Sequence, residues 1–433
     1  MKATKRTGIR VSVLFVGLGR LVASAAVLSV LVCMSPPTAA APARPLTSAQ
    51  RRYVSLAEQG VRRTARWKNA PRHWYNAVLD DRRPFPLAPV WDVFPLWESV
   101  SELALAAPSS AHRAAVIRFA DYAETYWDPN LKPGPGFIPY PSSAPSAARA
   151  GTKAYFDDNG WWGLAFLDAY RAVRQRRYLR DAEKAFGFIT RFGWDKHGGG
   201  IWWNNRHPWR SGEALAAASG LSARLYRLTG QHFYLRWAVK LITWANHHVL
   251  KWDGSYALKV PHEATMSHAG EGSMLSALTA LCETGASVPS AVYAGIAANS
   301  FGPNRTSDRL PYAPGSWCSW AEALATKTDL GVPSRQYRRV DAVVPLNDNP
   351  QTDAVYVRGL LDLYQHDHNH LWYDTATDSA TRILDNARGR RGLFLRGWNG
   401  ARKIRDSKPG MLRTHAASVS VFAALALIPP SGT

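Results

Sequence analysis

The chain has 433 residues, of which 46% are hydrophobic and 20% are charged, and it contains 18 Trp and 17 Tyr. This composition excludes an intrinsically disordered polymer and allows a large hydrophobic core. Its 53 Lys and Arg against 32 Asp and Glu give a formal net charge of +21, which favours electrostatic contact with an anionic cell envelope or an acidic polymer. The arginines are scattered and no nucleic-acid motif occurs, so nucleic acid is not a predicted partner.

The first 41 residues have the pattern of a secretory signal peptide. Two apolar stretches, 11–18 and 21–34, follow a basic start, and small residues surround the expected cleavage site near Ala41. An uncleaved membrane anchor is the alternative, but Arg20 interrupts the apolar run and each half is too short to span a bilayer. We therefore predict a secreted, extracellular protein whose mature part, residues 42–433, is a single catalytic domain without an internal linker.

Apolar and small residues recur at three- and four-residue spacing along most of the mature chain, which is typical of helices. The pattern predicts eleven helices, at residues 53–67, 111–127, 161–174, 178–192, 213–228, 234–250, 272–283, 290–301, 353–364, 371–387 and 414–427. No long stretch alternates with a period of two, so a large sheet is not expected.

Neighbouring helices pair into hairpins of similar length, for example 161–174 with 178–192. Eleven or twelve such helices fit a ring of six hairpins, in which an outer layer surrounds an inner layer. We therefore predict an all-α protein with an (α/α)6 barrel, a toroid of six helical hairpins whose loops form a cleft at one end. An open helical solenoid is the alternative, but no repeat period of that kind recurs along the chain.

Two adjacent carboxylates, Asp157 and Asp158, come shortly before the predicted helix 161–174. Neighbouring like charges repel and add nothing to a core, whereas cleavage of a glycosidic bond needs two carboxyl groups close together. Adjacency favours the short separation of a retaining enzyme. The positive end of the helix would keep one carboxylate ionised, and its charge would keep the other protonated. A helix N-cap with a solvated neighbour is the alternative explanation.

Aromatic residues flank the pair and recur after three glycines, 198–200. The apolar C–H faces of sugars pack on indoles, and glycines let a loop approach a ligand closely. Burial in the core explains each tryptophan taken singly, but it explains a glycine-flanked Trp-Trp-Asn in a loop less well. The candidate substrate-binding residues of these two segments are Tyr155, Asn159, Trp161, Trp162, Trp202, Trp203 and Asn204.

Phe-Asp-Asp-Asn-Gly-Trp-Trp at 156–162, followed by Gly-Gly-Ile-Trp-Trp-Asn at 199–204, resembles glycoside hydrolase family 76, the endo-α-1,6-mannanases. The resemblance implies an (α/α)6 barrel that hydrolyses internal α-1,6-mannosidic bonds with retention and needs no metal or organic cofactor. It also implies that Asp157 is the nucleophile and Asp158 the general acid/base. Further similar segments extend the resemblance over most of the mature chain, at 217–230, 357–364, 386–387, 398–400 and a final helix from 414.

Two segments depart from the family pattern. Where the family commonly shows Tyr-Asn-Gln-Gly entering a helix, this chain has His-Ala-Gly-Glu-Gly at 268–272. Where the family tends to show Phe-Lys-Gly-Ile-Phe, this chain has Thr-Asp-Ala-Val-Tyr at 352–356. The exchanges introduce Glu271 and Asp353, and Glu271 joins the substrate-binding candidates. The catalytic pair is intact, so we expect glycosidase activity with subsites that are not all those of the family.

Cysteine and histidine raise the question of a disulfide or a metal. In an exported protein Cys282 and Cys318 can form a disulfide or remain two buried thiols, and the sequence leaves both open. Histidines at 247, 248, 262, 268, 366, 368 and 370 could suggest a metal centre. No His-Glu-x-x-His occurs, and the last cluster falls in an expected loop, so no metal is predicted.

We expect a monomer that acts on a polysaccharide, an α-mannan or another mannose-containing glycan. Two alternatives share the scaffold. One is a catalytically silent carbohydrate-binding or envelope protein, and the other is an (α/α)6 enzyme for an acidic glycan, which the positive charge of the chain motivates.

Overall fold

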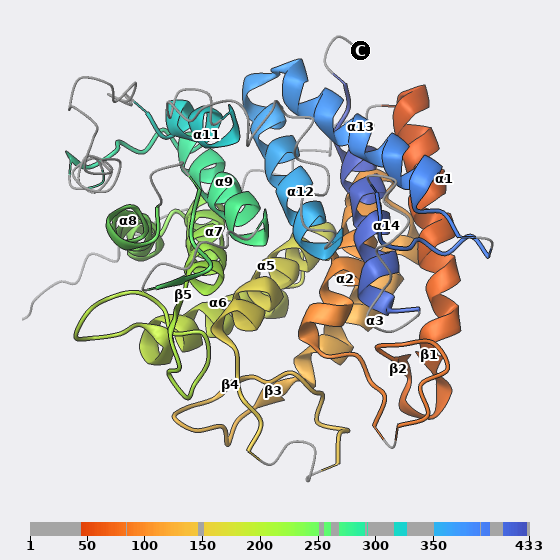
Figure 1. Ribbon diagram of the computed structural model, residues 1–433, viewed down its shortest axis with the longest axis horizontal. Helices are drawn as coiled ribbons and strands as arrows, with labels where there is room; N and C mark the ends of the chain where they lie inside the picture. The colour runs from red at the N-terminus through yellow and green to blue at the C-terminus, as the bar shows by residue number, and fades with distance from the viewer. Residues whose placement is uncertain are drawn as a thin grey trace, which may run out of the picture. The chain divides into compact units, whose positions relative to one another are not determined.

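The computed structural model describes residues 45–83, 85–145, 151–250, 255–260, 268–290, 292, 316–326, 350–389, 391–398 and 410–430. Helices dominate these residues (Figure 1). The helices are α1 (Ser48–Arg63), α2 (Val90–Ala106), α3 (Ser110–Glu124), α5 (Phe156–Val173), α6 (Arg176–Phe188), α7 (Gly212–Thr229), α8 (His232–His248), α9 (His268–Cys282), α11 (Trp317–Thr326), α12 (Pro350–Asp367), α13 (His370–Asn386) and α14 (Leu412–Leu427). Short antiparallel strand pairs join β1 (Lys68–Asn69) to β2 (Trp74–Tyr75), β3 (Trp127–Asp128) to β4 (Gly136–Phe137), and β5 (Arg210–Ser211) to β6 (Lys259–Val260).

Six of the described helices form a closed inner ring. In the order α2, α5, α7, α9, α12 and α14, each packs against the next, and α14 packs against α2. The helices α1, α3, α6, α8, α11 and α13 each contact this ring from outside, and each comes before an inner helix along the chain (Figure 1). The predicted (α/α)6 barrel is therefore confirmed.

Burial patterns explain which helices lie inside. Every residue of α9 is buried, as expected for a helix with neighbours on all sides. In the outer helix α8 the buried residues Tyr234, Ala238, Leu241 and Ala245 follow a spacing of three and four, so α8 buries one stripe and exposes the rest. Inner helices therefore carry the core, and outer helices cover it.

Two inner helices approach so closely that their contact requires glycine. A Cβ at Gly272 of α9 would lie 2.4 Å from the carbonyl oxygen of Val355, and one at Gly359 of α12 would lie 2.6 Å from that of Gly272. Neither distance is compatible with a side chain, so the backbones of α9 and α12 pack directly against each other.

A buried cluster of charges crosses the inside of the ring. Arg358 of α12 pairs with Asp168 of α5 at 2.6 Å and with Glu102 of α2 at 3.3 Å, and it also contacts Glu98. Because α12 is a neighbour of neither α2 nor α5 in the ring, these contacts span its interior. Burial raises the pKa of Glu98 to about 7 and that of Glu102 to about 8, whereas nearby arginines lower the pKa of Asp168 to about 2 despite its burial.

Two helices were not predicted from the sequence. α2 is buried along nearly its whole length, so it has no polar face to give a periodic pattern, and it contains Pro95, which usually marks a helix end. α11 spans only ten residues. The predicted helix at 290–301 lies outside the described residues, except for Ser290 and Val292.

From Leu46 onward the described residues belong to one compact unit. None of the helices that the structure describes is long and apolar enough to cross a membrane. The predicted signal peptide, residues 1–41, lies outside the described residues and stays a prediction.

Candidate active site

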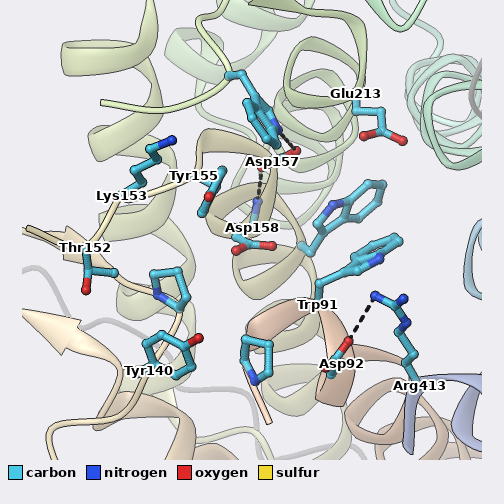
Figure 2. Close-up of a pocket in the computed structure, with 14 residues that line it drawn as sticks. Trp91, Asp92, Tyr140, Thr152, Lys153, Tyr155, Asp157, Asp158, Glu213 and Arg413 are labelled. Carbon is cyan, nitrogen blue, oxygen red and sulfur yellow. Dashed lines mark hydrogen bonds and ion pairs between the residues drawn. The ribbon is translucent and has the colours of Figure 1, made fainter. Parts of the chain in front are cut away.

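A pocket of about 580 Å³ lies at the end of the ring where inner helices begin. Its walls come from the first turns of α2, α5, α7 and α14 and from loops beside them (Figure 2). The lining residues are Pro89, Trp91, Asp92, Pro139, Tyr140, Thr152, Lys153, Tyr155, Asp157, Asp158, Trp161, Trp203, Glu213 and Arg413. The positive ends of four helix dipoles meet there, which favours negative charge in the pocket.

The predicted pair lies in the first turn of α5, which begins at Phe156, and therefore inside the helix instead of before it. Both carboxyl groups face the pocket, and Asp157 is 8% exposed. Each oxygen of Asp157 accepts a hydrogen bond at 2.9 Å, Oδ1 from the backbone N–H of Asp158 and Oδ2 from the indole N–H of Trp203. These two donors fix the orientation of the Asp157 carboxylate and stabilise its ionised form.

The two carboxyl groups have different surroundings. Burial and the charge of Glu213 raise the pKa of Asp157 to about 7, although the N–H donors of Asp158 and Trp203 act in the opposite direction. Burial raises the pKa of Asp158 well above its usual range, and the charges of Asp157, Asp92 and Glu213 act in the same direction. Asp157 therefore loses its proton first, and as pH rises through about 7 it ionises while Asp158 is still protonated.

The glycine-rich loop places Trp203 against the pair. Gly199 and Gly200 have positive φ angles of 72° and 84°, and a Cβ on either would lie within 2.6 Å of the Trp244 ring. After this turn the backbone returns to α5, where the N–H of Phe156 donates to the carbonyl of Trp203 at 3.0 Å. Trp203 also stacks on Trp209 with ring centroids 4.4 Å apart. The aspartate pair and the glycine-flanked tryptophans therefore meet at the pocket.

The structure places the predicted substrate-binding residues in two groups. Tyr155, Trp161 and Trp203 line the pocket together with the catalytic pair. The other five do not line it, and they are Asn159, Trp162, Trp202, Asn204 and Glu271.

These five residues have contacts that explain their position. Asn159 is buried, where it accepts from the N–H of Phe137 and donates to its carbonyl, and Trp162 packs on Trp97 in the core. Asn204 accepts the N–H of Arg206 at 3.0 Å, and Trp202 stacks on His207. Glu271 is buried in α9 and accepts the N–H of Tyr256. Their side chains support the loops and helices around the site, and we leave them out of the proposed sugar contacts.

Several pocket residues were not predicted from the sequence. Trp91 and Asp92 belong to α2, the helix that the pattern missed, and Glu213 and Arg413 begin α7 and α14. Arg413 pairs with Asp92 at 3.2 Å across two neighbouring inner helices. An acid in the first turn of a helix is common, so nothing in the local sequence separates Glu213 from an ordinary dipole partner.

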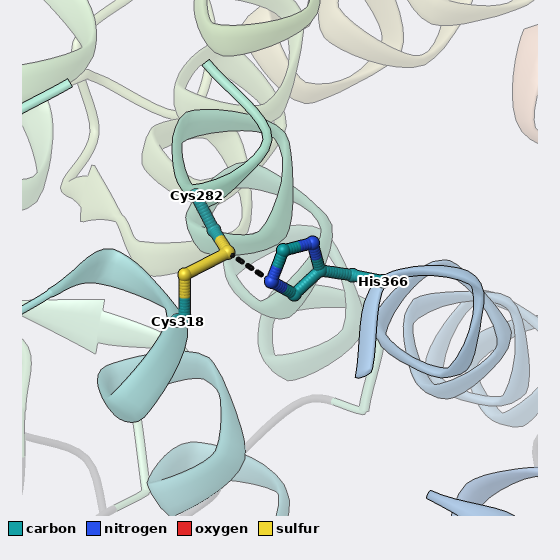
Figure 3. Close-up of side chains that lie close together, drawn as sticks. All are labelled: Cys282, Cys318 and His366. Carbon is teal, nitrogen blue, oxygen red and sulfur yellow. Dashed lines mark hydrogen bonds between the residues drawn. A yellow bond between two sulfur atoms is a disulfide. The ribbon is translucent and has the colours of Figure 1, made fainter. Parts of the chain in front are cut away.

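One cluster of described residues has the side chains of a metal site. The ligand atoms of Cys282, Cys318 and His366 lie within 4.8 Å of one another, but a disulfide joins the two cysteines (Figure 3). His366 Nε2 lies 2.7 Å from Cys282 Sγ. The question that the sequence left open is thus answered in favour of the disulfide, and sulfurs joined in this way are not thiolate ligands.

Among the residues that the structure describes, the remaining histidines belong to no other group that could hold a metal ion. His268 contacts the buried Asp353 between α9 and α12, and His247 and His248 end α8. His262 lies outside the described residues. No described residue of the pocket itself is a histidine or a cysteine.

Comparison with known proteins adds to this geometry. Residues 141–278 match the model of glycosyl hydrolase family 76, and this stretch contains both the aspartate pair and the loop 199–204. The resemblance to glycoside hydrolase family 76 is confirmed. A family 76 α-mannanase of Bacteroides thetaiotaomicron has a similar structure, with a TM-score of 0.68 and 18% identity over 87% of this chain and 95% of that chain. No curated protein matches the chain.

Two further solved structures are informative. An inactive variant of a family 76 α-1,6-mannanase from Salegentibacter sp. HEL1_6, with two consecutive aspartates replaced by asparagine, was solved with α-1,6-mannotriose. It has a TM-score of 0.60 and 14% identity over 87% of this chain and 99% of that chain. A cellobiose 2-epimerase from Spirochaeta thermophila has a TM-score of 0.58 and 14% identity over 89% and 98% of the two chains. Because the fold also occurs in an epimerase, the fold alone does not distinguish a hydrolase from an epimerase.

Proposed function

We propose that the protein is a glycoside hydrolase that cleaves α-1,6-mannosidic linkages of a mannan-type polysaccharide or envelope glycan with retention of configuration. The observation that carries the proposal is the pair Asp157 and Asp158 in one pocket, with the carboxylate of Asp157 held by two N–H donors. The family 76 match spans this pair, and the inactive Salegentibacter variant is altered at two consecutive aspartates, which supports the same roles here.

The reaction proceeds by two displacements at the anomeric carbon. In the first, the Asp157 carboxylate attacks this carbon while Asp158 gives its proton to the glycosidic oxygen, so the C–O bond breaks and a glycosyl ester forms. In the second, Asp158 takes a proton from water, whose oxygen attacks the same carbon and releases Asp157. Each displacement inverts the carbon, so the product keeps the configuration of the substrate. The proton arrangement of the free site, Asp157 ionised and Asp158 protonated, is the one that the first step requires.

The pocket suits a neutral sugar better than an acidic one. Four carboxyl groups line it, against the cations of Lys153 and Arg413, and Arg413 is already paired with Asp92. A uronic acid would meet net negative charge there. Trp91 and Trp203 instead offer apolar faces for the C–H groups of a sugar ring, whereas Trp161 is nearly buried and packs behind Trp91. The acidic-glycan alternative is therefore disfavoured by the site, although the whole chain is basic.

The pair also argues against a silent binding protein. Two like-charged groups in a partly closed pocket destabilise each other, and strongly raised pKa values of this kind cluster at catalytic sites. A protein that only binds sugar could form the same aromatic pocket without two neighbouring carboxyl groups that destabilise each other.

Substitution of each aspartate tests the proposal. We expect Asp157→Asn and Asp158→Asn each to lower turnover of linear α-1,6-mannan by about 10²-fold to 10⁴-fold, because one removes the nucleophile and the other the proton donor. The measurement is reducing-sugar release, with NMR of the first product to follow its anomeric configuration and chain length. Uronic-acid polymers serve as the comparison substrates.

Asp378→Asn is the matched control, since Asp378 lies exposed on α13 in an ion pair with Arg382. It should leave turnover unchanged, and thermal unfolding should confirm that all three variants are folded. Full activity in both dyad variants, or first products of inverted configuration, would overturn the proposal.

We also propose that residues 1–41 direct export and are removed. The basic start, the apolar stretches and the small residues before Pro42 support this. N-terminal sequencing of the protein from the culture medium should begin near Pro42, and a cell-bound chain that begins at Met1 would contradict it.

A further inference from the structure

Glu213 brings an additional carboxylate to the pocket beside the pair, although a double displacement needs only two. It is the second residue of α7, and the hydroxyl of Ser211 caps this helix by accepting the N–H of Ala214 at 3.2 Å. Gly212 allows the close approach of this turn, because a Cβ there would lie 2.0 Å from the carbonyl oxygen of Ala257. The start of α7 is therefore held tightly in place.

The helices that carry Glu213 and the pair are neighbours in the inner ring. α5 and α7 pack closely, since a Cβ at Gly160 would lie 2.6 Å from that of Ala217. Figure 2 shows the Glu213 carboxylate on the same side of the pocket as Asp157. A negative charge in a partly closed pocket interacts with its neighbours more strongly than it would in bulk water.

The other charged and titratable groups around the pair come from each element that borders the pocket. They are Asp92 of α2, Arg413 of α14, and Tyr140, Lys153 and Tyr155 of the loops. Arg413 offsets the charge of Asp92 at 3.2 Å, and the Lys153 side chain is exposed to solvent. The charge of Glu213 is the largest side-chain charge effect on the pKa of Asp157, and it also raises the pKa of Asp158, on which Asp157 and Asp92 act more strongly.

We propose that Glu213 is a positioning residue that sets the pH range in which Asp157 and Asp158 act, through its negative charge on the neighbouring helix, without itself attacking or protonating the sugar. The inference rests on the proposed function, because it assigns Glu213 a part in the same double displacement. A general acid must keep its proton at the pH at which the nucleophile has already lost its own, and a third charge beside the pair moves this pH range upward for both carboxyl groups.

Glu213→Gln tests this role, because it removes the charge and keeps the shape. Both aspartates should then ionise more easily, so the acid and alkaline limbs of the kcat/KM profile should both move to lower pH, by about one pH unit. Glu213→Asp keeps the charge and should leave both limbs in place. If the limbs do not move in Glu213→Gln, whatever happens to kcat or KM, Glu213 only contacts substrate or supports the fold, and the proposal is overturned.

A titration without substrate separates this inference from the proposed function. In protein labelled with ¹³C at the aspartate carboxyl groups, Asp158→Asn identifies the resonance of Asp158, and that resonance should titrate at lower pH in Glu213→Gln than in the unaltered protein. A shifted titration in a protein that cleaves no mannan would refute the proposed function and leave the charge effect of Glu213 standing. An unshifted titration in an active mannanase would refute the inference alone.

Discussion

The indole of Trp203 decides how Asp157 faces the pocket. Its N–H donates to Asp157 Oδ2, its backbone carbonyl accepts the N–H of Phe156, and its ring stacks on Trp209. A carboxylate held by an indole and a backbone amide keeps one orientation, as an attacking group requires. At this position the tryptophan therefore serves both as an aromatic wall and as a hydrogen-bond donor.

Trp203→Phe separates these two roles. Phenylalanine keeps an aromatic face toward Trp209 but removes the donor, so the ionised form of Asp157 loses a charge-assisted hydrogen bond and its pKa rises. We expect the acid limb of the kcat/KM profile to move to higher pH by about one unit, with a loss of about tenfold in kcat/KM on that limb. The profile should be measured on α-1,6-mannan from pH 4 to pH 9.

Trp209→Phe is the matched control, since it alters the same stack and leaves the indole N–H of Trp203 in place. Its acid limb should not move. Equal shifts in both variants would mean that stacking, and not the hydrogen bond, controls Asp157.

Local sequence could predict the pair and its aromatic surroundings, but it could not predict the rest of the site. Asp157, Asp158 and Trp203 lie in motifs of unusual composition, so they stood out. Glu213 and Arg413 lie in ordinary helix starts, and only the ring brings them to the pocket. Asn159 and Trp162 were predicted to bind substrate but are buried. A motif does not show which of its side chains point into the protein core.

Among the elements, α9 and α12 show how tightly inner helices can pack. Their contact places Gly272 against the backbone of α12 and Gly359 against Gly272 itself. A methyl group at such a position has no flexible neighbour to displace, so the helices would have to separate.

Gly272→Ala should therefore destabilise the protein, by about 1–3 kcal/mol or more in the free energy of unfolding. Gly187→Ala in α6 is the matched comparison, because Gly187 is exposed and a Cβ there meets no atom within 4 Å. That change should be stabilising by about 0.5–1 kcal/mol through helix propensity alone. Urea denaturation of both variants gives the two values, and a Gly272→Ala protein as stable as the original would contradict the close contact.

Helix type and order could be predicted well, whereas helix starts could not. α5 begins at Phe156 and α9 at His268, several residues before the apolar spacing begins. The first turns of these inner helices carry polar residues, such as Asp157, Asp158 and Glu271, that interrupt the pattern. α2 was not predicted because it is apolar on nearly every side, which leaves no periodic pattern, and because it contains a proline.

For the molecule as a whole, the charges inside the ring link stability to pH. The pKa values of Glu98 and Glu102 in the folded protein lie above their ordinary value, at about 7 and about 8, because burial outweighs their attraction to Arg358. Between pH 5 and pH 8 the folded state therefore binds more protons than the unfolded state, and stability falls as pH rises. Asp168, with a pKa of about 2, has the opposite effect, and its contribution is lost only as pH falls below about 4.

We expect the free energy of unfolding to decrease from pH 5 to pH 8, by up to about 1.4 kcal/mol per pH unit for each such group. Glu102→Gln removes one of them and should make the decrease less steep. Chemical denaturation at several pH values measures the slope, with Glu322→Gln on the exposed side of α11 as the control that keeps the original slope. A slope unchanged by Glu102→Gln would show that this carboxyl is ionised throughout.

The contact between α14 and α2 has a consequence for biosynthesis. α2 is the first inner helix to be translated and α14 the last, yet they lie side by side and supply Asp92 and Arg413 to one cavity. While the ribosome is still synthesising the chain, the first five inner helices can pack against one another. The ring cannot close until α14 has been made and packs between α12 and α2. Nascent or truncated chains that stop before Leu412 should thus have no working catalytic chamber, so assembly of the barrel and onset of activity should coincide.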